Sequence, residues 1–190
     1  QNQSSAASDV YKRQIIYTSI VAFAQTDIKK LIAYSSIAHM GFVTLGIFSF
    51  NKEGINGAIF QMISHGIISG ALFAMVGSIY QRLHTRKIAE ISGVVNSMPN
   101  FAILFMIFTF GSVALPGTSG FVGEFLVLAG IYQISPYFMI LAAMGVILGA
   151  IYMLSLARRM IFGAALNQKI EQLNDLSNRE LAILVPLALM

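Results

Sequence analysis

The sequence contains no cysteine and few charged residues. The absence of cysteine excludes disulfides, thiolate metal sites and cysteine nucleophiles. Only 11% of the residues are charged, whereas soluble domains carry about 25%. Hydrophobic residues make up 56% of the chain, and the mean hydropathy is +0.74. This composition predicts a polytopic membrane protein whose first partner is the lipid bilayer. The net charge of +4 does not indicate nucleic acid, because the basic residues lie mainly at the ends of apolar segments.

The apolar segments predict an all-α, polytopic bundle of transmembrane helices. A helix needs about 20 apolar residues to cross a bilayer. Four segments are long enough for a complete span: 31–50, 55–80, 100–133 and 137–157. The segment 100–133 is interrupted by helix-breaking residues. Two shorter apolar stretches, 15–24 and 181–190, are interpreted as partial spans. The predicted bundle therefore has about four complete and two partial spans.

Residues 1–14 differ from the rest of the chain. They are polar and join abruptly to the apolar run that begins at Ile15. We interpret them as a non-native or artefactual leader, with a genuine extramembrane loop as the alternative. Residues 15–190 are then one transmembrane domain, interpreted as a fragment of a longer chain.

The basic residues predict the orientation in the membrane. When the membrane crossings are counted, three basic segments lie on the same side: 29–30, 82–87 and 158–159. Lys52 lies on the other side. The positive-inside rule assigns the more basic side to the cytoplasm or to an organelle matrix. We interpret these lysines and arginines, Arg82 among them, as setting topology only.

Between Pro99 and Gln133, Glu124 is the only acidic residue, and no lysine, arginine or histidine is present. About 34 helical residues would reach ~50 Å, against a hydrocarbon core of ~30 Å, so this segment is too long for one straight crossing. Helix-breaking residues predict the interruption near its middle: Pro116, Gly117 and Gly120. Acids inside membrane segments are costly and by default indicate function. Glu124 is therefore a candidate proton-relay acid, and the alternative is a structural carboxylate that binds the broken backbone.

Two consecutive predicted spans each carry a histidine, and each histidine lies on the same face of its own helix as other polar residues. His39 lies four positions after Ser35 and three positions after Ser36. His65 lies four positions after Gln61 and four positions before Ser69. Imidazole can pass a proton between its two nitrogens, which favours a polar proton path; a hydrogen-bonded core residue is the alternative. No third ligand and no zinc spacing accompany the histidines, so we predict no metal site. No phosphate-binding or dinucleotide motif indicates a bound cofactor.

Four stretches resemble a known family. Residues 24–42, AQTDIKKLIAYSSIAHMGF, are similar to the signature of the antiporter-like membrane subunits of complex I, the proton-pumping NADH-quinone oxidoreductase. The other three narrow the resemblance to the subunit M (chain 4) branch: QMISHG at 61–66, RLHTR at 82–86 and LPGTSGFVGEF at 115–125. Glu124 discriminates best, because the sister subunits L and N usually carry lysine there. The resemblance covers about residues 15–190.

The resemblance implies a function in proton translocation coupled to electron transfer from NADH to quinone. Glu124 would be the terminal proton-relay acid, with His39 and His65 on the hydrated path toward it. NADH, FMN, iron–sulfur clusters and quinone would bind elsewhere in the complex, so this chain would bind no cofactor and perform no redox chemistry. Subunits L and N would be its neighbours. The bacterial inner membrane is the expected location, and the mitochondrial inner membrane is the alternative.

Two other classes of function remain open. One is a subunit of a cation/proton antiporter or of a membrane-bound hydrogenase, which the same fold would serve; glutamate rather than lysine at position 124 disfavours the antiporter. The other is a structural membrane scaffold, in which Glu124 and the two histidines only make packing hydrogen bonds.

Overall fold

The computed structural model describes residues 10–163, 170 and 172–189, and every regular element within these ranges is a helix. This confirms the all-α prediction. In chain order the elements are η1 (Val10–Tyr17), α2 (Thr18–Phe23), α3 (Ile28–Ile47), α4 (Lys52–Leu83), η2 (Ile88–Ile91), η3 (Val94–Asn96), α5 (Pro99–Ser112), α6 (Ser119–Ile134), α7 (Pro136–Ile161) and α9 (Asn178–Leu189).

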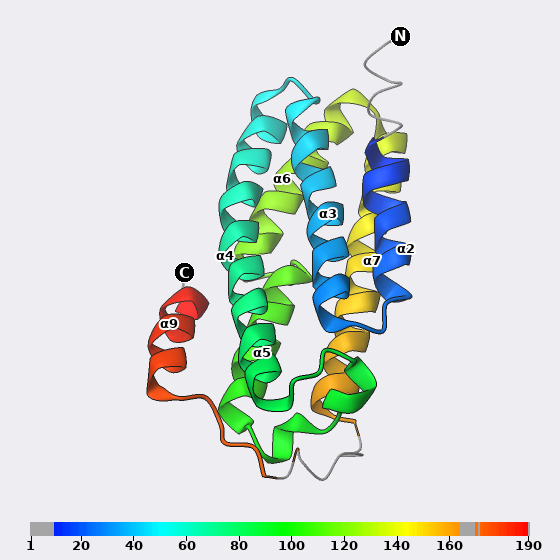
Figure 1. Cartoon of the computed structure of the whole chain (residues 1–190). Coiled ribbons are helices and arrows are strands. Elements are labelled where there is room, and N and C mark those ends of the chain that lie inside the picture. Colours follow the sequence, from blue (N-terminus) through cyan, green and yellow to red (C-terminus); the bar gives the residue numbers. More distant parts are fainter. Residues whose placement is uncertain (1–9, 164–169, 171, 190) are drawn as a thin grey trace.

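Three helices are each long and apolar enough to cross a membrane. They are α3, α4 and α7, whose most apolar windows have mean hydropathies of 1.2, 1.7 and 2.3. The fourth predicted span is divided between α5, with 14 residues, and α6, with 16. In Figure 1, α6 starts near mid-height of the bundle and rises beside α4, whereas α5 occupies the lower half. The predicted interrupted crossing is therefore present as two successive helices.

The predicted partial spans are short helices at the two ends of the described chain. At the first end, η1 runs directly into α2, so no turn marks the predicted boundary after residue 14. The predicted leader lies largely in residues 1–9, outside the described residues, and it stays a prediction. At the other end, α9 lies beside α4 at the edge of the bundle (Figure 1) and contains Pro186.

Side chains cap the starts of two helices, α3 and α9. The Asp27 carboxylate accepts the backbone N–H groups of Lys29 and Lys30 at 2.8 and 3.1 Å, so it caps α3. Before α9, the Glu180 carboxylate accepts the N–H of Ser177 at 2.7 Å. The Ser177 hydroxyl in turn accepts the N–H of Glu180 at 3.4 Å. This reciprocal pair is a capping box, and it fixes where α9 begins.

The break between α5 and α6 begins earlier than the helix-breaking residues indicate. The backbone N–H of Leu115 donates to the carbonyl of Phe110 at 3.1 Å. Ala114 adopts a left-handed conformation with φ of 55°. These two features define a Schellman-type end for α5, at which glycine is the usual left-handed residue. The helix therefore ends at Ser112, before Pro116 is reached.

The three predicted helix breakers have different places in the structure. Pro116 and Gly117 lie in the break, and Gly117 has φ of 99°, a conformation that favours glycine. Gly120 instead belongs to the first turn of α6. A β-carbon on Gly120 would collide with the carbonyl oxygen of Gly111. Gly120 thus allows the start of α6 to pack against the end of α5.

Glycines also bring α6 close to α4. A β-carbon on Gly57 of α4 would lie 2.6 Å from the backbone nitrogen of Val127 of α6. A β-carbon on Gly123 of α6 would lie 2.9 Å from the Cα atom of Gln61 of α4. Helix backbones approach this closely only where side chains are absent. The short separation brings side chains of α4 within reach of the acid that follows Gly123.

Gly123→Ala is therefore expected to force α4 and α6 apart. Overpacking of this kind costs about 1–3 kcal/mol. The matched control is Gly70→Ala on α4, where a β-carbon would meet nothing within 4 Å. Thermal unfolding of the purified full chain in detergent measures both variants. We expect a lower unfolding temperature for Gly123→Ala alone, and equal stability of the two variants would contradict the packing account.

The basic loops meet at one end of the bundle, the lower end in Figure 1. The N–H of Ile28 donates to the carbonyl of Arg86 at 3.0 Å, and the N–H of Ile88 donates to the carbonyl of Thr26 at 2.9 Å. The N–H of Gly93 binds the carbonyl of Met160, near the end of α7, at 3.0 Å. The predicted grouping of these loops at one end is thus present.

Candidate functional site

Glu124 lies in the second turn of α6 and is only 3% exposed. Its position follows from the local structure. The break ends α5, the chain turns at Gly117, and α6 then starts with two small residues, Ser119 and Gly120, that permit close packing. An isolated carboxylate would be very costly in such a buried place, so its partners determine what it can do.

His39 of α3 is the direct partner of Glu124. Its Nδ1 atom lies 2.8 Å from Oε1 of Glu124, and the His39 side chain is also buried. The Gln61 amide of α4 donates to the same oxygen at 3.2 Å. The structure therefore brings together one residue from each of three helices, all of which the sequence had suggested separately.

The second ring nitrogen of His39 faces the end of α5. Its Nε2 atom lies 3.4 Å from the hydroxyl oxygen of Ser112. If Glu124 is ionised, Nδ1–H donates to it and the Ser112 hydroxyl donates to Nε2. If Glu124 is protonated, it donates to Nδ1, and Nε2–H donates to Ser112. The imidazole can thus exchange a proton with Glu124 and keep a hydrogen bond on each side.

His65 of α4 is the next titratable group along the cluster. Its ring centroid lies 5.1 Å from that of His39, with 37° between the ring planes. The side chain is 9% exposed. Beside it, the Ser64 hydroxyl donates to the Ser119 hydroxyl at 2.9 Å. Two histidines and one carboxylate therefore form a buried row across α4, α3 and α6, which we call the His65–His39–Glu124 row.

The predicted serines are less central to this row. The Ser35 hydroxyl donates to the carbonyl of Ile32 at 2.8 Å, within its own helix. The Ser36 hydroxyl oxygen is buried and has no hydrogen-bond partner within the described part of the chain. Ser69 is half-buried, and no hydrogen bond between described residues joins it to the row. Of the predicted supporting residues, only Gln61 has a hydrogen bond to the row among the described residues, and the supporting path stays a prediction.

Sequence reasoning missed Ser112 and Tyr152. Ser112 is the last residue of α5, and its position just before the break was the signal that could have identified it. Tyr152 of α7 is 1% exposed. Tyr152 lies in an apolar segment without a stripe of polar residues, so the helical periodicity of the sequence did not indicate it as a site residue. Among the described residues, no group of three or more potential metal ligands is present.

Arg82 does more than set topology, which corrects the sequence interpretation. Its guanidinium binds both carboxylate oxygens of Glu180, at 2.8 and 2.7 Å. It also donates to the backbone carbonyls of Ser78, Asn174 and Asp175. The Arg82 and Glu180 side chains are only 18% and 21% exposed. Arg82 therefore joins the end of α4 to the start of α9.

Arg82→Lys tests this structural role. Lysine keeps the positive charge that topology requires, but it cannot reproduce the planar, bidentate contact. Losing hydrogen bonds to a charged group costs about 1.5–3 kcal/mol. We expect a lower unfolding temperature of the full chain and faster proteolysis in the segment before α9, with insertion unchanged. Normal stability with lysine would restore the topology-only interpretation.

Known proteins resemble this chain in sequence. A family model described as "NADH:quinone oxidoreductase/Mrp antiporter, TM" matches residues 12–151. NADH-quinone oxidoreductase subunit M of Rhodobacter capsulatus is 57% identical over 176 residues, 93% of this chain and 34% of the relative. NADH-ubiquinone oxidoreductase chain 4 of Marchantia polymorpha is 49% identical over 172 residues, 90% of this chain and 35% of the relative.

The fold has a match among solved structures. A chain in respiratory complex I from Thermus thermophilus with bound NADH gives a TM-score of 0.89 at 33% identity, covering 98% of this chain and 40% of that chain. The present chain spans about a third of the length of the curated relatives that it matches.

The chain forms a transmembrane bundle with a broken helix, a buried acid and two adjacent histidines, and ionisable residues inside membrane segments by default indicate function. The family match then gives a specific assignment. The chain belongs to the NADH:quinone oxidoreductase/Mrp antiporter transmembrane family.

Proposed function

We propose that this chain forms part of the proton path of a proton-translocating membrane subunit of NADH-quinone oxidoreductase, of the subunit M type. The single observation that carries the proposal is the buried 2.8 Å contact between His39 Nδ1 and Glu124 Oε1. A carboxyl group and an imidazole at this distance can share and exchange a proton. If this contact served only to pack the helices together, apolar side chains would suffice in place of the imidazole and the carboxyl group.

In the proposed mechanism, His39 receives a proton on one ring nitrogen and transfers one from the other. Ser112 is the hydrogen-bond partner on one side of the ring and Glu124 on the other. The Gln61 amide stabilises the ionised carboxylate after it releases its proton. His65, with its ring 5.1 Å away, is placed to pass protons to or from His39 through a bridging water or a ring rotation. Glu124 is the last protonatable group of the row.

The wider setting is proposed from the relatives. The 57% identity to the subunit M of a bacterium supports a place in a bacterial inner membrane. We propose that the basic loop end faces the cytoplasm, in accord with the positive-inside rule. Subunits L and N are the proposed neighbours. NADH oxidation, its cofactors and quinone reduction are assigned to other subunits, so this chain contributes proton transfer and no redox group.

Complementation tests the proposal. The full chain that contains this segment would be expressed in a bacterium that lacks its own subunit M. We expect it to restore NADH-driven proton uptake into inverted membrane vesicles, measured with a pH-sensitive dye. A sodium gradient imposed without NADH tests the alternative. If that gradient drives proton movement while NADH-driven uptake is not restored, the chain is an antiporter subunit and the proposal is wrong.

A further inference from the structure

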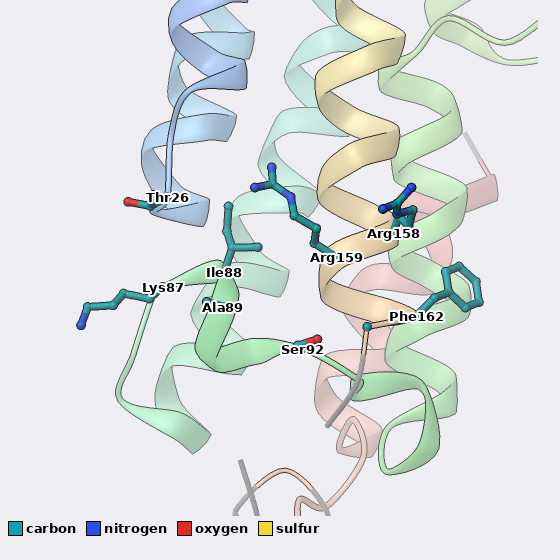
Figure 2. Close-up of a pocket in the computed structure, with 9 residues that line it drawn as sticks. Thr26, Lys87, Ile88, Ala89, Ser92, Arg158, Arg159 and Phe162 are labelled. Carbon is teal, nitrogen blue, oxygen red and sulfur yellow. The ribbon is translucent and has the colours of Figure 1, made fainter. Parts of the chain in front are cut away.

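A cavity of about 710 Å³ lies at the basic end of the bundle, away from the His65–His39–Glu124 row. Figure 2 shows its walls: the last turn of α7 on one side, and the start of η2 on the other. Three of the lining residues are cationic: Lys87, Arg158 and Arg159. None of the lining residues in the described part of the chain is acidic. The cavity therefore favours a negatively charged occupant.

The two arginines are available to such an occupant. Among the described residues, no carboxylate pairs with Arg158 or Arg159, and Arg159 Nε donates only to the carbonyl of Ser155, at 3.3 Å. In Figure 2, the Arg159 guanidinium reaches into the space between Ile88 and α7. Lys87 points outward at the rim, where its ammonium group lies 3.1 Å from Glu90.

Glu90, the acid in η2 beside the cavity, is paired within its own loop. Glu90 accepts a hydrogen bond from the Thr85 hydroxyl and pairs with Lys87. The Thr85 hydrogen bond, with Lys87 beside it, holds the pKa of the Glu90 carboxyl below its ordinary value. Glu90 is thus already paired with Lys87 and Thr85 on its own loop, and it does not neutralise Arg158 or Arg159.

The apolar surface next to the cavity fits hydrocarbon chains. Ile147, Ile151 and Leu154 of α7 are 61%, 49% and 42% exposed, and they recur at the spacing of one helix face. Arg158 continues this face by one more turn, at the end of the helix. Phe162, which is 63% exposed, extends the apolar rim. A strip of exposed apolar side chains thus leads along α7 to a pair of cations.

We propose that this cavity binds the phosphate headgroup of an anionic phospholipid, with the acyl chains along the exposed strip of α7. Arg158 and Arg159 pair with the phosphate oxygens, and guanidinium groups suit this bidentate geometry. Basic pockets at the cytoplasmic ends of membrane helices are suited to anionic headgroups. The contrast with Lys29 and Lys30 supports a specific site, because those two cations are exposed and are not among the residues that line this cavity.

Lipid binding to the full chain tests the proposal directly. The chain would be purified in nanodiscs that contain either phosphatidylglycerol or only phosphatidylcholine, and retained lipid would be counted by native mass spectrometry. The test variant is Arg158→Gln with Arg159→Gln. We expect roughly a tenfold to thirtyfold loss of phosphatidylglycerol retention, as two lost surface charges predict. Arg158→Lys with Arg159→Lys should restore most of it, which separates loss of charge from misfolding.

The matched control is Lys29→Gln with Lys30→Gln, the same change of charge at the same end of the bundle. It should leave phosphatidylglycerol retention within about twofold of the parent chain. An equal loss in both double variants would show only general attraction to an anionic surface and would overturn the proposal. Inorganic phosphate is the third arm. If millimolar phosphate stabilises the chain through the two arginines while phosphatidylglycerol does not, the cavity takes free phosphate and the lipid assignment is wrong.

Discussion

Replacing Glu124 with glutamine is expected to stop proton transfer through this chain. Glutamine keeps the size of the side chain and can still hydrogen-bond to His39 and Gln61, but it cannot release a proton. A positioned acid or base typically contributes 10²–10⁴-fold to proton-transfer rates, so we expect proton transfer through the chain to fall about 100-fold or more. The measurement is NADH-driven proton uptake by vesicles that hold the complete complex, with electron transfer recorded in parallel.

The matched control for this prediction is Glu53→Gln. Glu53 lies in the first turn of α4, is half-buried and has no contact with the row, so the same change there should leave proton uptake unaltered. Glu124→Asp should be intermediate, because the acid is kept but the shorter side chain loses its contact with His39. Full coupled pumping in a well-folded Glu124→Gln complex would assign Glu124 to packing and support the structural-scaffold alternative.

Replacing His39 is expected to have the second largest effect, larger than the same change at His65. His39 makes the direct contact with the carboxylate, whereas His65 lies beside the ring of His39. Leaving a buried polar group without its hydrogen-bond partner costs about 1–3 kcal/mol. His39→Gln should therefore both slow proton uptake and lower the unfolding temperature, and His65→Gln should mainly slow uptake.

A double-mutant cycle of His39→Gln and Glu124→Gln separates coupling from general damage. If the two side chains act as a pair, the double variant should be more stable than the sum of the single losses predicts. Its interaction energy should fall within the 0.5–3 kcal/mol usual for residues in contact. Additive losses in unfolding free energy would mean that the 2.8 Å contact contributes nothing of its own.

Much of the fold could be predicted from the sequence because lipid leaves few options. A chain with so few charges has to satisfy its backbone inside helices, so the lengths of the apolar runs gave the spans. Helix ends were less certain. Several helices extend beyond the apolar runs to include charged residues, such as Lys52 at the start of α4 and Arg158 in the last turn of α7. The position at which α5 ends was not predicted, because Ala114 adopts a left-handed backbone conformation that alanine rarely takes.

The candidate site was only half predictable. Helical periodicity placed His39, His65 and Gln61 on polar faces, and Glu124 was conspicuous by its charge. Periodicity describes one helix at a time, so it could not reveal that His39 and Glu124 touch across 85 positions of sequence. The same limit hid Ser112 and the contact between Arg82 and Glu180. Packing between helices decides these contacts, and at α4 and α6 it depends on glycines whose role is visible only in three dimensions.

Infrared difference spectroscopy of the full chain in its complex tests the central claim most directly, namely that Glu124 changes protonation together with His39. The account predicts a carboxyl C=O band that appears on a change of pH or on turnover. The band should vanish in Glu124→Gln and shift in frequency in His39→Gln, while remaining in Glu53→Gln. A difference spectrum whose carboxyl region is identical in the parent chain and in Glu124→Gln would contradict the account.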